Sequence, residues 1–159
     1  MRYFFSILSR CPSRYSQSIT IAGLSFTTFK YSGLRLSSSK ADDAASGHNV
    51  TVTVQVQNTG GRDGKEVVQV YSTPLSGAAF PAGAPKQNLV AFQVVAVPHG
   101  GTKTVSIDVD PAQWETAMAD GTRTIVPGQY TVAVGGHQPK DSEGSAGTSG
   151  AAVTAQLHL

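Results

Sequence analysis

The sequence predicts an all-β protein, an immunoglobulin-like sandwich of about seven antiparallel strands. Three observations support this prediction. Apolar and polar residues alternate over several short segments, turn residues separate most of those segments, and no long amphipathic helical pattern occurs. The chain has 159 residues, enough for one domain that buries ~70 % of its unfolded surface.

Three segments show the clearest alternation. Residues 50–57 place valines on one side and Thr or Gln on the other, and residues 104–110 and 130–134 follow the same period. Each therefore predicts a strand with one buried face. Four more segments are β-rich: residues 24–36, 65–71, 89–97 and 151–159. The best helical candidate is a single turn over residues 111–116.

Tyr130 stands at the start of a late strand, directly after the Pro127-Gly128 corner. A tyrosine in this place can donate its hydroxyl to nearby backbone and pin the corner, or it can simply cap the core. Residues 37–47, 74–88 and 137–150 are rich in Ser, Gly, Pro and Ala, and we expect them to be irregular.

The composition excludes several classes of function. Charged residues are 14 % of the chain and the net charge is +2, which is too weak for a nucleic-acid footprint. No apolar run approaches the ~18 residues of a membrane span. Cys11 is the only cysteine, so neither an intrachain disulfide nor a thiolate metal cluster is expected. The missing cysteine pair favours the disulfide-free fibronectin type III branch of the fold class.

Residues 1–22 are expected to be a poorly ordered leader of unknown role. Arg2 and the short apolar stretch at residues 3–8 are similar to a truncated signal peptide. The stretch is shorter than the usual ~7–15 residues, and no A-x-A-like cleavage site comes after it. A short signal peptide is therefore the minority alternative, and Cys11 is a poor candidate for a catalytic thiol.

The segment 58–71, NTGGRDGKEVVQVY, is the densest turn signal of the chain. It is one residue shorter than a phosphate-binding G-x-x-x-x-G-K-[ST] loop, and a strand stands where that loop requires a helix. Nucleotide binding is therefore rejected. We expect Gly60, Gly61 and Gly64 to supply the positive φ of a turn. We also expect Val68 and Val70 to enter the core and the charged side chains of the loop to be solvated.

No catalytic dyad or metal site emerges from spacing. Asp108 and Asp110 are roughly 7 Å apart along one strand face, within the ~5–9.5 Å that glycoside hydrolysis uses. They share that face with Thr104 and Ser106, which indicates a solvated surface. The four histidines, at positions 48, 99, 137 and 158, show no ligand spacing. No metal and no cofactor is predicted.

Trp114 is the only tryptophan. It is a candidate for stacking on a sugar ring, as is Tyr71, but the favoured alternative is that Trp114 covers one end of the core. Asn49, in the sequence Asn49-Val50-Thr51, is an N-glycosylation acceptor that matters only in a secreted protein.

Residues 23–34, GLSFTTFKYSGL, resemble the "GLSYTTFxYSxL" motif that begins the C-terminal fibronectin type III-like domain of family 3 glycoside hydrolases. Residues 50–71, 85–92, 101–105 and 126–136 resemble further motifs of that domain in the same order. The segment 85–92 is similar to "P-x-K-x-L-x-G-F", with Ala91 in place of the glycine. The resemblance covers residues 23–159, which we take as the domain.

The resemblance implies a context of carbohydrate metabolism. Family members are β-glucosidases and β-xylosidases, usually secreted, and both catalytic carboxylates lie in domains N-terminal to this one. No catalytic residue is carried over to this chain, which is therefore predicted to be inactive alone. The segment "GGHQP" at 135–139 favours a β-xylosidase parent and a role in xylan degradation.

The resemblance also implies a non-catalytic, stabilising accessory domain. Its expected partners are the catalytic domains of a family 3 glycoside hydrolase, within the same chain in the family, and plant cell-wall polysaccharide is a second candidate. Leu24, Phe26 and Phe29 are candidates for a docking face. The alternative function is a stand-alone carbohydrate- or polymer-binding module.

Overall fold

The computed structural model describes residues 27–37, 49–75, 80, 85–139 and 152–159. The proposed leader 1–22, Cys11, Leu24, Phe26 and His48 lie outside these ranges. The elements in chain order are β1 (Phe29–Leu36), β2 (Val50–Asn58), β3 (Gly64–Pro74), β4 (Asn88–Val97), β5 (Thr102–Val109), the 3-10 turn η1 (Pro111–Trp114), β6 (Glu115–Ala117), β7 (Arg123–Ile125), β8 (Gln129–Gly135) and β9 (Val153–His158).

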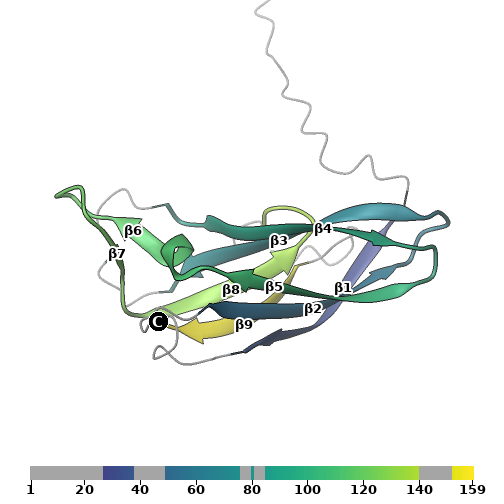
Figure 1. The fold of residues 1–159 in the computed structure, drawn as a ribbon, viewed down its shortest axis with the longest axis horizontal. Coiled ribbons are helices and arrows are strands. Elements are labelled where there is room, and N and C mark those ends of the chain that lie inside the picture. The colour runs from purple at the N-terminus through teal and green to yellow at the C-terminus, as the bar shows by residue number, and fades with distance from the viewer. Residues whose placement is uncertain (1–26, 38–48, 76–79, 81–84, 140–151) are drawn as a thin grey trace, which may run out of the picture.

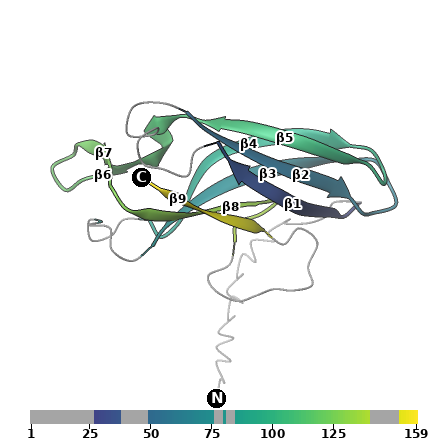
Figure 2. The same cartoon turned by 90° about the horizontal axis from the view of Figure 1, so that it is seen from below.

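Two antiparallel sheets form the sandwich. One has the strand order β1-β2-β5 and the other β4-β3-β8-β9 (Figure 2). The short hairpin β6-β7 projects from one end of the molecule (Figure 1). The predicted all-β sandwich is therefore confirmed. Among the described strands, the sequence missed those of the hairpin, whose three residues each are too few to show a period. None of the helical residues described forms a segment long and apolar enough to cross a membrane.

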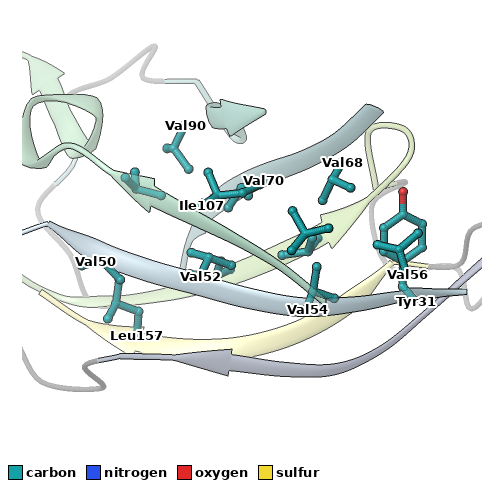
Figure 3. Packing of buried hydrophobic residues seen from close by; sticks show 14 of the residues in the cluster. Tyr31, Val50, Val52, Val54, Val56, Val68, Val70, Val90, Ile107 and Leu157 are labelled. Carbon is teal, nitrogen blue, oxygen red and sulfur yellow. The ribbon is translucent and has the colours of Figure 1, made fainter. Parts of the chain in front are cut away.

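The core consists mainly of valines from the facing sides of the two sheets (Figure 3). On β2, Val52, Val54 and Val56 are fully buried, and the intervening Thr and Gln residues point outward. Val68 and Val70 of β3 are also fully buried, as predicted. Burying a side chain of this size stabilises the fold by about 1.5–3 kcal/mol, so period-2 patterning largely determines which face of each strand packs inward.

Strand β4 departs from simple alternation. The register of β3 with β4 shifts between Val70 and Tyr71, where Val70 pairs with Ala91 and Tyr71 with Leu89. Val90 is the extra residue in this bulge, and it is 3 % exposed. A bulge places one additional residue on one strand and changes the direction in which the neighbouring side chains face. The outward positions of β4 consequently include Leu89, Phe92 and Val94.

The end of the sandwich beside η1 is closed by aromatic residues. Tyr130 packs edge-to-face against both Phe80 and Trp114, with ring centroids 5.8 Å and 6.4 Å apart. The Tyr130 hydroxyl donates to the carbonyl of Val126 over 2.6 Å. This confirms that Tyr130 pins the corner before β8.

Candidate functional site

The outer face of the β1-β2-β5 sheet is polar and bonded to itself. Thr51 Oγ1 donates to Asp108 Oδ1 over 2.7 Å, and the hydroxyls of Thr53 and Ser106 lie 3.1 Å apart. Asp110 instead accepts from the backbone N–H of Ala112 at 2.8 Å and caps η1. The two aspartates therefore serve separate local bonds, and among the described residues they do not form a carboxylate pair of the kind that cleaves a glycosidic bond.

The outer face of the β4-β3-β8-β9 sheet is different, because it exposes large apolar side chains. Phe92 is 65 % exposed, Val94 57 %, Leu89 48 % and Val67 41 %. Val67 and Val94 are cross-strand partners, and Phe92 and Leu89 lie along the same side of β4. We call these four residues the apolar patch.

Tyr71 borders the apolar patch, since it pairs with Leu89. Its hydroxyl donates to Gln69 Oε1 over 2.6 Å, and Gln69 Nε2 donates to the carbonyl of Gly136 over 3.1 Å. Partial burial raises the pKa of Tyr71 above its usual value. Tyr71 and Gln69 therefore connect the patch to the end of β8.

Asn58 organises the corner where β2 turns into β3. Its side chain is fully buried, and its amide nitrogen donates to the carbonyls of Arg62 at 2.8 Å and Val97 at 3.0 Å. Its side-chain oxygen accepts from Thr27 Oγ1 at 2.5 Å and from the N–H of Gly60 at 3.1 Å. All four hydrogen-bonding positions of the amide are used, so Asn58 ties the loop to the segment that leads into β1.

The prediction that Gly60, Gly61 and Gly64 supply positive φ angles was wrong, since none of the three is among the glycines with positive φ. Gly60 is required for a different reason. A Cβ there would overlap Thr27 Oγ1 and would lie 2.6 Å from the backbone nitrogen of Thr28. A Cβ at Gly64 would lie 2.5 Å from Thr27 Cγ2, whereas one at Gly61 would meet nothing within 4 Å.

His99, in the β4–β5 turn, closes the same corner. Its backbone N–H donates to Asp63 Oδ1 over 2.7 Å, and its ring Nδ1 lies 2.7 Å from the carbonyl oxygen of Gly60. A carbonyl cannot donate, so Nδ1 carries the proton in this contact. The Asp63 carboxylate and the Gly60 carbonyl of the glycine-rich loop are thus bonded to the protein itself.

Glu66 corrects the prediction that the loop charges are all solvated. Its Oε1 accepts a 2.7 Å hydrogen bond from the Tyr31 hydroxyl, which links β3 to β1 of the other sheet. Burial raises the pKa of Glu66, and the bond from Tyr31 and the charge of His137 oppose that shift. Burial, with the bond to Glu66, raises the pKa of Tyr31 above its usual range. Gly136 lies so close that a Cβ there would overlap Glu66 Oε1.

The residues singled out from the sequence lie in different places. Trp114 is 2 % exposed and buried against Tyr130, so its ring cannot stack on a sugar from the surface, and the alternative of an end cap fits the structure. Phe29 is 4 % exposed and part of the core, which removes it from any docking face. Asn49 is exposed directly before β2. Among the described residues, no three His, Cys, Asp or Glu side chains are grouped closely enough to hold a metal ion.

The apolar patch was not predicted. Residues 89–97 form an almost continuous apolar run, which is typical of a strand buried on both faces, so its outward side was not suspected. By simple alternation, polar Gln93 would face outward and its neighbour Phe92 inward, so nothing in the sequence indicated that Phe92 is exposed.

Comparison with known proteins identifies the sandwich. A family model described as "Fibronectin type III-like domain" matches residues 66–138. The beta-xylosidase of Formosa agariphila is 34 % identical over 119 residues, which are 75 % of this chain and 16 % of that enzyme. The periplasmic beta-glucosidase of Salmonella typhimurium is 32 % identical over 123 residues, 77 % of this chain and 15 % of that enzyme.

A solved structure agrees. The beta-glucosidase DesR from Streptomyces venezuelae superposes with a TM-score of 0.63 and 27 % identity, over 85 % of this chain and 15 % of DesR. The molecule is thus a fibronectin type III-like sandwich. More narrowly, the chain belongs to the family of C-terminal fibronectin type III-like domains of family 3 glycosidases. It spans 16 % or less of the length of the xylosidase and of the periplasmic glucosidase.

Proposed function

We propose that this chain, over residues 23–159, is a non-catalytic accessory domain that stabilises the catalytic domains of a family 3 glycosidase. One observation carries the proposal: the matched region is three quarters of this chain but only 16 % of a relative described as a beta-xylosidase. Most of such an enzyme lies outside the matched region. An accessory role explains a well-packed domain that exposes an apolar patch on β3 and β4.

The state of the acidic residues supports this proposal. Every carboxylate in the described part of the chain has a local partner: Asp63 with His99, Glu66 with Tyr31, Asp108 with Thr51, Asp110 with Ala112, Glu115 with Arg123 and Asp120 with Thr122. Retaining hydrolysis needs two carboxyl groups about 5–5.5 Å apart on either side of one bond. The described residues offer caps and cross-links in place of such a pair.

The direct test is to assay the purified chain on aryl β-xyloside and aryl β-glucoside. We expect no turnover above a buffer control. Turnover that persists through successive purification steps, and co-elutes with the chain, would contradict the proposal.

The alternative function is a carbohydrate- or polymer-binding module. Trp114 is buried, but Tyr71 and Phe92 lie diagonally across β3 and β4 and present an aromatic pair on the outer face. Sugar rings stack on aromatic side chains through their apolar faces. Affinity electrophoresis on xylan and cellulose tests this: retardation that Tyr71→Ala or Phe92→Ala removes would favour the alternative over the accessory role.

The proposal also states which type of enzyme the domain comes from and where that enzyme is located. A β-xylosidase parent active on xylan rests on the segment 135–139, GGHQP, and a secreted or periplasmic location rests on relatives such as the periplasmic beta-glucosidase. If the protein is secreted from a eukaryotic cell, exposed Asn49 should be glycosylated. Mass spectrometry of the secreted chain, compared with Asn49→Gln, checks this expectation.

A further inference from the structure

The two outer faces of the sandwich are unlike one another. The outward positions of β2 and β5 carry Thr, Gln, Ser and Asp, and several of these side chains bond to each other. The outward positions of β3 and β4 carry the apolar patch, which includes all the exposed large hydrophobic residues among those described. A contiguous apolar patch on an otherwise polar molecule indicates an interaction surface.

The apolar patch is not a by-product of core packing. The bulge at Val90 turns both Val90 and Ala91 toward the core, and Ala91 packs against the buried cluster. Phe92 and Leu89 are left on the outside, where they bury little surface against their own domain. These two residues are the leucine and phenylalanine of the segment that resembles P-x-K-x-L-x-G-F. The domain therefore carries family-motif residues that its own core does not use.

We propose that the apolar patch is the surface on which a catalytic domain of a family 3 glycosidase docks, with Phe92 as its central anchor. This inference rests on the proposed function and names the surface that serves it. We take the partner to be a catalytic domain because of chain length. The beta-xylosidase of Formosa agariphila, for example, is matched over only 16 % of its chain, so the rest of such an enzyme is available to cover this face.

The residues around the apolar patch also indicate what kind of partner surface can cover it. Lys65 is the charged residue on the outward side of β3 beside Val67, and Glu66 points inward to Tyr31. The partner surface should therefore be apolar at its centre and should place no cation opposite Lys65. Large aromatic side chains at the centre of an interface commonly carry most of its binding energy.

The experiment uses a chimera in which this chain replaces the matching domain of the Formosa agariphila beta-xylosidase. The half-life of xylosidase activity at an elevated temperature is measured for the chimera, for the enzyme truncated before this domain, and for two chimera variants. The test variant is Phe92→Lys with Val94→Lys. The matched control is Ser106→Lys with Thr53→Lys, on the polar face of the other sheet. Thermal unfolding of the isolated chain with each pair of substitutions shows whether the domain itself still folds.

We expect the chimera to outlast the truncated enzyme at least about tenfold. The Phe92 and Val94 pair should return the half-life to that of the truncated enzyme, and the control pair should change it less than about twofold. A chimera no longer-lived than the truncated enzyme would contradict the proposed function itself. A protective chimera that the Phe92 and Val94 pair leaves unchanged would overturn the docking surface alone. A dimer of the isolated chain that Phe92→Lys dissociates would assign the patch to a second copy instead.

Discussion

Position 60 requires glycine because neighbouring atoms leave no room for a Cβ, and not because its φ is positive. Because a Cβ would overlap Thr27 Oγ1 and lie 2.6 Å from the Thr28 nitrogen, Gly60→Ala must push the segment that leads into β1 away from the loop. Overpacking of this kind costs about 1–3 kcal/mol. The free energy of unfolding of Gly60→Ala, measured by urea denaturation, should fall by that amount.

The matched control for this prediction is Gly61→Ala, one residue further on. A Cβ at Gly61 meets nothing within 4 Å, and Gly61 is not among the glycines with positive φ. Its substitution should leave stability unchanged or raise it by up to about 1 kcal/mol, through a less flexible unfolded chain. Equal losses for the two variants would mean that the close approach at Gly60 is not what selects glycine.

Glu66 should make stability depend on pH. Burial raises its pKa in the folded state, so the folded protein binds this proton more tightly than the unfolded chain does. The resulting stabilisation is fully present below the unfolded-state pKa and is lost as the pH rises through the folded-state pKa. Glu66→Gln keeps an acceptor for the Tyr31 hydroxyl without the charge, so it should gain stability relative to the wild type as the pH rises from acid toward neutral.

Denaturation of both proteins across this pH range provides the measurement. A stability difference between Glu66→Gln and wild type that stays constant with pH would show that Glu66 titrates normally. If the wild type instead becomes more stable relative to Glu66→Gln as the pH rises, the pKa of Glu66 is lowered in the folded state, and the bond from Tyr31 outweighs burial.

Among the elements of the fold, the corner before β8 depends on one hydroxyl. Tyr130 donates to the carbonyl of Val126 inside the core, and Tyr130→Phe leaves that carbonyl without this partner. The expected loss is about 1–2 kcal/mol of unfolding free energy. Tyr71→Phe is the control, because its hydroxyl bonds a neighbouring side chain on the outer face, and it should change stability by less than about 0.5 kcal/mol. Indistinguishable thermal unfolding of Tyr130→Phe and wild type would count against a pinned corner.

Strands differ in how well their sequence predicts them. β2, β5 and β8 were predictable because apolar residues occupy every second position, a pattern that indicates a strand with a buried face. β4 was predictable as a strand but not in its facing, since a bulge leaves no local mark in an apolar run. The hairpin β6-β7 was missed because three residues are too few to show a period.

The corner and the patch show the same limit on prediction. Asn58 and Gly60 act through Thr27, Val97 and other residues distant in sequence, so their roles depend on contacts that composition and spacing do not contain. The glycine-rich loop was correctly predicted to be a turn. The reason for its glycines was wrong, because close contacts and not positive φ angles require Gly60. For Trp114 the sequence favoured an end cap over a sugar platform without excluding the platform, and its burial now distinguishes the two.

The whole molecule, in the proposed arrangement, turns the polar face of one sheet to solvent and the apolar patch on the other sheet to a glycosidase. Folding alone does not require Phe92 to be apolar, since its side chain is 65 % exposed. A larger enzyme that covers the apolar patch would explain why position 92 is apolar. It also explains how a domain whose described carboxylates all have local partners can still matter to catalysis, by stabilising the domains that perform it.

A crystal structure of the chimera with the Formosa agariphila beta-xylosidase would reveal which face is covered. We predict that Phe92, Val94, Leu89 and Val67 are buried against a catalytic domain, while Thr53 and Ser106 on the opposite sheet remain in solvent. A structure in which Phe92 stays exposed and the polar β1-β2-β5 face contacts the catalytic domains would contradict the proposed arrangement.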